Sequence, residues 1–131
     1  MKEEIDKKIK LHQTWVETLG REGEQLYVTE VDLREGNFSY MNLVDAILPE
    51  VDFSYAKFID TDLTYSNLAS SNFYMANLTG AQLTKADADY ASFEKAVMIN
   101  LEAFRATFIS ANLKEANLMG ANLSRALFSG N

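Results

Sequence analysis

A few side chains in this 131-residue chain are of types that catalyse reactions or bind metal ions. His12 is the sole histidine, and close acidic pairs occur at Asp60 and Asp62 and at Asp87 and Asp89. A histidine needs further ligands to hold a metal, and neither aspartate pair has the repeated oxygen ligands and fixed glycine of a calcium loop. We therefore expect His12 to pack and hydrogen-bond inside the fold, and these aspartates to accept hydrogen bonds from turn backbone.

The sequence also gives little support for catalysis, cofactor binding or nucleic-acid binding by other residues. The chain has no cysteine, no Ser-His-Asp or Cys-His set and no glycine-rich phosphate loop, so we predict no enzymatic activity and no cofactor. A net charge of −7 disfavours direct binding to nucleic acid or to an anionic membrane. Stacking of bases would need tyrosines gathered along one groove, but their spacing in the repeat described next spreads them over four faces. These tyrosines are Tyr40, Tyr55, Tyr65, Tyr74 and Tyr90.

A large apolar residue recurs at every fifth position from Leu33 to Phe128, and it is Leu or Phe except at Ala88, Met98 and Ala103. The residue two positions earlier is usually small. At about 100° per residue, a helix would spread such a series around its surface, and a strand would alternate it between faces. The chain must instead turn a corner once per five-residue phrase. Four corners close a square coil, with the large and the small residue inside.

The phrase is clearest at residues 111–125, where Ala-Asn-Leu-x-x occurs three times in succession. It resembles the Ala-(Asp/Asn)-Leu-x-x motif of pentapeptide-repeat proteins, over roughly residues 26–130. The resemblance implies an all-β solenoid, a right-handed quadrilateral parallel β-helix, here of about five coils with an N-terminal α-helical cap. We divide the chain into a helical cap and turn over residues 1–24 and the pentapeptide-repeat β-helix over residues 25–131.

Residues 3–19 have the spacing of an amphipathic helix, and Gly20 and Gly23 suit its end and the turn that follows. The apolar side of this helix comprises Ile5, Ile9, His12, Val16 and Leu19. Because the ends of a solenoid expose its core, we expect Ile9, Trp15 and Val16 to pack over the first coil. Leu26 to Val28 is interpreted as an incomplete first phrase.

The N-terminal sequence is charged and is not followed by a long apolar run, so we expect neither a signal peptide nor a membrane span. Together with the absence of cysteine, this favours a cytoplasmic protein.

Acidic residues concentrate in the early coils, where we predict an acidic patch of Asp45, Glu50, Asp52, Asp60 and Asp62. Some pentapeptide-repeat proteins are acidic dimers that resemble duplex DNA and bind DNA gyrase, so gyrase or topoisomerase IV is an alternative partner. Five coils spaced about 4.8 Å apart stand about 24 Å tall, a length over which duplex DNA carries roughly 14 charges. The phrases from residue 31 to 130 carry 12 acidic and 7 basic residues, a weaker net charge.

Apolar residues also occupy positions that should face outward, mainly in residues 91–110. They form a predicted partner stripe of Ile59, Val97, Ile99, Phe104 and Met119. A local bulge that buries them is the alternative, because Leu101 and Ala103 exchange the usual small and large residues in the same segment.

The final phrase leaves core side chains at the end of the last coil, and we expect a homodimer through Leu123, Leu127 and Phe128. The function predicted from the sequence is a non-catalytic scaffold or protein-binding module with a protein partner of unknown identity.

Overall fold

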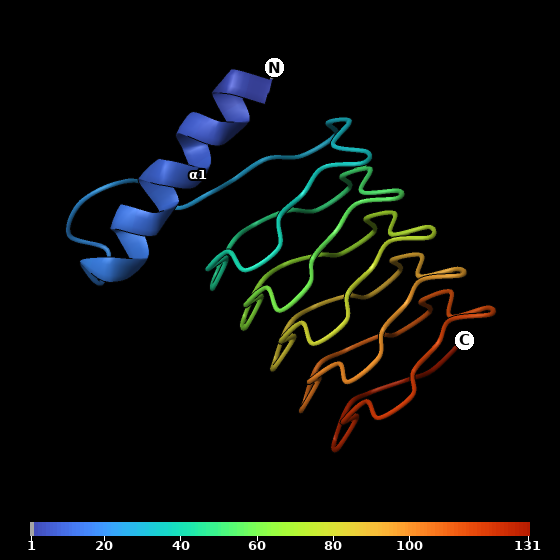
Figure 1. The fold of residues 1–131 in the computed structure, drawn as a ribbon. Coiled ribbons are helices and arrows are strands. Elements are labelled where there is room, and N and C mark those ends of the chain that lie inside the picture. The colour runs from blue at the N-terminus through green and yellow to red at the C-terminus, as the bar shows by residue number, and fades with distance from the viewer. Residues whose placement is uncertain (1) are drawn as a thin grey trace.

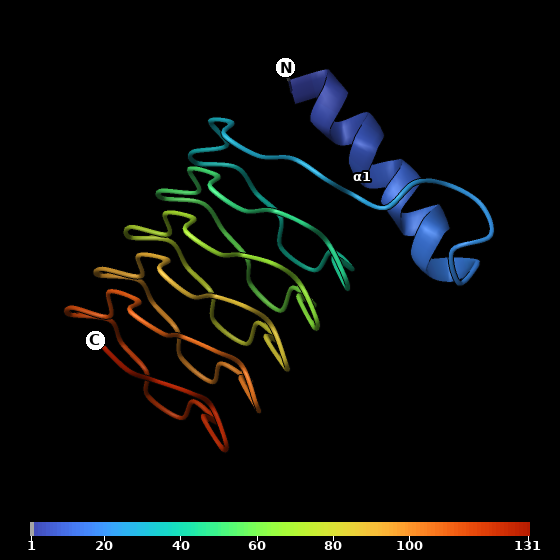
Figure 2. The same ribbon diagram turned by 180° about the vertical axis from the view of Figure 1, so that it is seen from behind.

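The computed structural model describes residues 2–131, which form one helix followed by a stack of square coils (Figure 1). Helix α1 spans Lys2–Glu17 and lies at the N-terminal end of the stack, while the C-terminus lies at the opposite end (Figures 1 and 2). No helix within residues 2–131 combines the length and the apolar character needed to cross a membrane.

Helix α1 ends two residues before the predicted boundary. Leu19 and Gly20 adopt positive φ angles of 55° and 84°, and the Gly20 N–H returns to the Trp15 carbonyl at 2.8 Å. This left-handed turn ends the helix and directs Leu19 into solvent, where it is 87% exposed. The spacing predicts Leu19 on the apolar side of the helix, and this prediction is wrong.

The coils are held together by parallel bridges between residues twenty positions apart, from Tyr27 with Ile47 to Thr107 with Leu127. Four phrases therefore complete one turn, and we refer to coils by their ranges, beginning with residues 31–50. The faces A, B, C and D are named after the phrases that begin at residues 31, 36, 41 and 46. Leu26 and Val28 are buried on either side of Tyr27, which supports their interpretation as an incomplete phrase.

Every corner from Leu33 to Leu123 except the one at Pro49 is a turn closed by a backbone hydrogen bond, as from the Ala46 N–H to the Leu43 carbonyl at 3.1 Å. The fifth residue of every phrase from Glu30 to Gly130 has a positive φ angle. Most of these residues are not glycine, so the left-handed conformation costs energy at each corner. Contacts between coils stabilise it up to Ser110, because the fifth residue donates its N–H to the next coil, as Tyr55 does to the Tyr74 carbonyl at 2.9 Å.

Third-position side chains fill the interior, as the sequence predicts. Phe53, Phe73 and Phe93 stack along face A, with successive ring centroids 5.1 and 5.0 Å apart. Leu101 and Ala103 are both buried, so the exchanged pair still fills the core. In residues 111–130 the third-position leucines are only partly buried, because no further coil of the described chain lies over them.

Candidate partner-binding surfaces

One aspartate of each acidic pair accepts a hydrogen bond within its turn. Second-position Asp and Asn residues accept hydrogen bonds from the N–H two residues later, as Asp62 Oδ1 does from Thr64 at 3.0 Å and Asp87 Oδ1 does from Asp89 at 2.9 Å. Asp89 Oδ1 in turn accepts from the Ile109 N–H of the next coil at 2.9 Å. The predicted role in turn backbone is therefore confirmed for Asp62 and Asp87, whereas the Asp60 carboxylate accepts no hydrogen bond from the described residues. Within residues 2–131 no group of three His, Asp or Glu side chains converges.

His12 joins α1 to the first coil. Its Nδ1 accepts a hydrogen bond from the Leu26 N–H at 2.9 Å, which leaves the proton on Nε2, and Nε2 donates to the Val44 carbonyl at 2.9 Å. The ring is fully buried and stacks on Trp15, with centroids 5.5 Å apart. Burial lowers the pKa of His12 from its ordinary value of 6.5, although the Val44 carbonyl and Asp45 favour the charged form. The predicted packing and hydrogen-bonding role is confirmed.

The helix residues expected over the first coil differ in how deeply they are placed. Ile9 is buried, and Ile5, one helical turn earlier, is equally buried. Trp15 and Val16 are partly buried and lie beside Val44. The helical spacing already contained Ile5, so its four-residue separation from Ile9 is the signal that identifies it.

The five residues of the predicted acidic patch do not lie together. Asp52 is on face A, Asp60 on face B and Glu50 on face D, while Asp45 and Asp62 are on face C. The physical reason is the period of the coil, since residues five apart in the sequence lie on different sides of the square. Acidic residues that are close in the sequence therefore encircle the stack.

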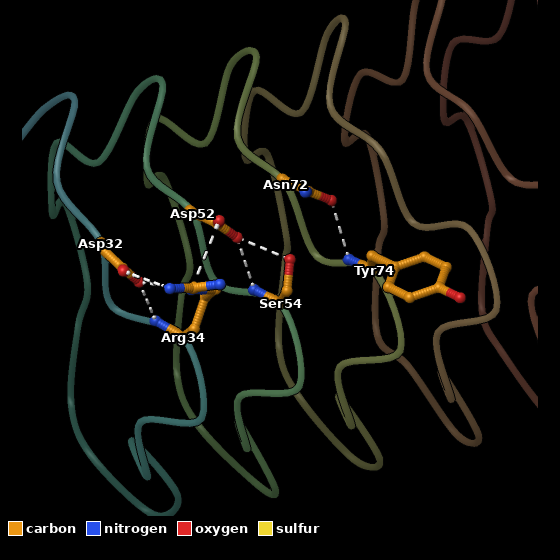
Figure 3. A network of polar contacts seen from close by, with 6 residues as sticks. All are labelled: Asp32, Arg34, Asp52, Ser54, Asn72 and Tyr74. Carbon is orange, nitrogen blue, oxygen red and sulfur yellow. Dashed lines mark hydrogen bonds and ion pairs between the residues drawn. The ribbon is translucent and has the colours of Figure 1, made fainter.

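A polar network that the sequence analysis did not identify runs along face A (Figure 3). Arg34 Nη2 lies 2.8 Å from Asp32 Oδ2, and its Nε lies 4.0 Å from Asp52 Oδ2 in the next coil. Asp52 Oδ1 also accepts hydrogen bonds from the N–H and the hydroxyl of Ser54. The hydrogen bond from Arg34 lowers the pKa of Asp32. Part of the negative charge of the early coils is therefore compensated locally.

The predicted partner stripe divides between two faces. Ile59, Ile99 and Met119 occupy the fourth position on face B, and Val97 occupies the second position on the same face. Phe104 lies around the next corner on face C. Met119 is 69% exposed, whereas the other four are half-buried.

The register is regular throughout this segment. Val97 bridges Asn77 in the preceding coil and Asn117 in the next, so residues 91–110 contain no bulge that could withdraw the apolar side chains. Thr79 lies between Ile59 and Ile99 in their column. The continuous apolar surface is thus Val97, Ile99 and Met119, with Phe104 adjacent and Ile59 separate.

The residues expected at a dimer end also have different environments. Leu123 is partly buried, and Phe128 is 39% exposed with its ring stacked on Phe108 at 5.0 Å. Leu127 is 56% exposed and occupies an outward second position on face D. Asn131 Nδ2 donates a hydrogen bond to the Ala111 carbonyl at 2.7 Å, so this backbone carbonyl of the C-terminal coil has a partner.

The five outward tyrosines named in the sequence analysis are distributed over the four faces as expected. Tyr40, Tyr65 and Tyr90 lie on faces B, C and D, while Tyr55 and Tyr74 form an edge-to-face pair on face A with centroids 5.7 Å apart. One pair of neighbouring rings does not make a continuous stacking groove.

A filled square solenoid built from five-residue phrases defines a repeat protein that offers its outer faces and its two ends for binding. The family model for pentapeptide repeats matches this chain in 8 copies, over residues 29–64, 62–100 and 104–130, and the chain belongs to this family. Its fold is accordingly the right-handed quadrilateral β-helix. No curated protein matches the chain.

Several solved structures resemble it. A pentapeptide repeat protein from the Arabidopsis thaliana thylakoid lumen is 22% identical over 73% of this chain and 63% of that one, with a TM-score of 0.44. HetL, involved in heterocyst differentiation regulation in the cyanobacterium Nostoc sp. strain PCC 7120, is 26% identical over 79% of this chain and 53% of its own, with a TM-score of 0.32. QnrB1, a plasmid-mediated fluoroquinolone resistance protein, is 17% identical over 78% of this chain and 72% of its own, with a TM-score of 0.38. The chain spans less than two thirds of the first two.

Proposed function

We propose that the protein is a non-catalytic scaffold that binds a protein partner through the apolar stripe. In this proposal α1 caps a β-helix of about five coils, and the coils present outward side chains in regular columns. Pentapeptide repeat proteins are generally structural or binding modules without catalytic activity, which supports this function.

The observation that carries the proposal is the continuous apolar surface on face B. Outward positions in the other coils hold mainly polar residues, but Val97, Ile99 and Met119 adjoin one another, and Phe104 extends the surface around the corner. Apolar residues grouped on a surface of this kind commonly mark protein-binding sites.

The test is affinity capture from the native cell extract with the double variant Ile99→Lys/Phe104→Lys. Thr79→Lys/Thr84→Lys is the matched control, because it places the same charges in the same two columns one coil earlier. We expect the stripe variant to lose a partner that the wild type and the control retain. Thermal unfolding of both variants checks that they fold. A partner retained by a folded stripe variant would contradict the proposal.

Capture of gyrase or topoisomerase IV would instead favour the alternative of DNA mimicry. That alternative depends on negative charge, so replacing Asp45, Asp52, Asp60 and Asp62 by Asn should abolish the binding. Binding through the apolar stripe should survive these replacements, because Asn in place of Asp52 and Asp62 retains the oxygen that accepts their turn hydrogen bonds.

We further propose that two copies associate through the C-terminal coil. Third-position N–H groups donate to the following coil up to Phe108, but those of Leu113, Leu118 and Leu123 have no partner within residues 2–131. The same end exposes part of Phe128. A second copy would cover these apolar side chains and unpaired donors.

Light scattering at several protein concentrations tests this association. Phe128→Glu should convert a dimer to a monomer, whereas Leu127→Glu, which places the same charge on the outward side of the coil, should have a smaller effect. A wild-type protein that is monomeric at all concentrations would exclude this association.

A further inference from the structure

A groove of about 500 Å³ lies between α1 and the first coil. Ile5 and Ile9 line it from the helix, and Leu33, Phe38 and Met41 line it from the coil. Its volume lies within the range of about 300–1,000 Å³ that is usual for ligand-binding sites. Helix α1 and the first coil, which line this groove, lie at the opposite end of the stack from the C-terminal coil (Figures 1 and 2).

The wall of this groove formed by face A is an unpaired backbone edge. In the second coil, the Asp52 N–H donates to Val31 at 3.0 Å, and its carbonyl accepts from the Leu33 N–H at 2.9 Å. The Ser54 carbonyl accepts from the Glu35 N–H at 2.9 Å. The equivalent groups one coil earlier are the Asp32 N–H, the Asp32 carbonyl and the Arg34 carbonyl. None of these three has a hydrogen-bond partner in the described chain, residues 2–131.

Side chains of α1 donate hydrogen bonds to backbone carbonyls at this end of the stack, but on another face of the coil. On face C, Gln13 Nε2 donates to the Asn42 carbonyl at 2.9 Å, and His12 Nε2 donates to the Val44 carbonyl at 2.9 Å. Among the described helix side chains, those from residue 3 onward, none donates to the carbonyl of Asp32 or Arg34. Asp32 and Arg34 are exposed, so this edge is open to solvent. An exposed and unpaired backbone edge is a template for pairing with another chain, so a segment that fills the groove can pair with it.

The rim of the groove is acidic. Asp6, Asp32 and Glu35 line it together with one basic residue, Arg34. Arg34 pairs with Asp32 and approaches Asp52, as Figure 3 shows, so its positive charge is already compensated by these two aspartates of face A. Among the described side chains, those of residues 3–131, Asp6 and Glu35 form no ion pair. Their charge favours a basic occupant.

We propose that this groove binds an extended basic-apolar peptide segment of a partner protein as an additional parallel strand on face A. The register follows from the coils below it: the carbonyl of the first peptide residue accepts from the Asp32 N–H. The N–H groups of the third and fifth peptide residues donate to the carbonyls of Asp32 and Arg34. The peptide therefore occupies the place of a missing phrase, in the manner of strand addition to a sheet edge.

The register also determines which side chains the peptide needs. Its third side chain points inward, among Ile5, Ile9 and Leu33, and should be Phe or Leu. Its second and fourth side chains point outward beside the acidic rim and should be Lys or Arg. The fifth position takes the left-handed conformation found at every corner, for which glycine suits best.

This inference is independent of the apolar stripe and of association through the C-terminal coil, because it concerns different residues at a different end. A failed peptide experiment would leave those proposals standing, and the reverse also holds.

Fluorescence anisotropy with a labelled peptide of sequence Ala-Lys-Phe-Lys-Gly tests the proposal. We expect saturable binding that weakens about tenfold when the Phe nitrogen is methylated, because one main-chain hydrogen bond is lost. Replacing both lysines of the peptide by glutamate should weaken binding further. In amide NMR spectra, the Asp32 N–H should shift on binding.

The matched protein variants are Asp6→Asn/Glu35→Gln and Glu50→Gln/Glu115→Gln, which remove the same charge at the groove and away from it. Only the first pair should weaken binding. Absence of saturable binding up to about 1 mM, the weakest affinity that such contacts would give, would overturn the proposal. Equal binding of the N-methylated peptide, or equal weakening by both variant pairs, would overturn it too.

Discussion

Two buried serines in consecutive phrases provide a sharp test of how the interior is stabilised. Ser66 and Ser71 both occupy the first position, and each is 1% exposed. The Ser71 hydroxyl donates to the Leu48 carbonyl at 2.7 Å and accepts from the Val51 N–H at 3.0 Å. The hydroxyl of Ser66 has no hydrogen-bond partner in the part of the chain that the structure describes. Replacing each by alanine should therefore change stability in opposite directions.

The expected changes in the free energy of unfolding follow from the hydrogen-bonding groups that each substitution removes or leaves unpaired. The turn containing Pro49 lacks the usual hydrogen bond between its ends, and Ser71 bridges both ends instead. Ser71→Ala leaves two buried backbone groups unpaired, and we expect the free energy of unfolding to fall by about 2–4 kcal/mol. Ser66→Ala removes a buried hydroxyl that lacks a partner, and we expect a gain of about 1 kcal/mol.

Urea unfolding of the wild type and both variants, followed by circular dichroism, measures these differences. The two substitutions remove the same atom from the same position of adjacent phrases, so each serves as the control for the other. Equal destabilisation by both variants would refute the reasoning, because the hydrogen bonds of Ser71 would then contribute nothing specific.

Three further predictions concern the helix, a corner and the core. Burial lowers the pKa of His12, so the unfolded state binds more protons than the folded state as the pH falls below 6.5. The free energy of unfolding, measured by denaturation at several pH values, should therefore decrease as the pH falls through 6.5. His12→Gln should remove this part of the pH dependence. Gly80→Ala should lower the free energy of unfolding by about 1–3 kcal/mol, since its φ angle is 70° and the new Cβ would meet the Asp60 carboxylate; Asp60→Ala should recover part of the loss in thermal unfolding of the double variant. Leu78→Ala should cost about 3–5 kcal/mol in urea unfolding, and Leu118→Ala in the same column less than half of that, because Leu118 is only partly buried; equal costs would contradict this account.

The sequence by itself determined the repeating unit and its inward side. A large apolar residue at every fifth position cannot form one buried stripe on a helix or a strand, so the chain must turn regularly. The roles of second-position residues such as Asp62 and Asp87 were also predictable, because an Asx turn involves only residues two positions apart. These features depend on local spacing, which a single sequence contains.

The tertiary structure decided which outward residues meet. Neighbours on a face lie twenty positions apart, so Asp45, Asp52 and Asp60 separate onto different faces although they are close in the chain, while Arg34 approaches Asp52. The left-handed corners at residues such as Tyr55 also depend on hydrogen bonds to the next coil, since the residue type alone disfavours that conformation.

The placement of α1 was likewise beyond the sequence pattern. Apolar spacing predicted that Ile9 would cover the coil, but the hydrogen bonds of His12 to Leu26 and Val44 determine which side of the first coil the helix occupies. Because these contacts lie on one side, the edge at Asp32 remains unpaired and the groove beside it stays open.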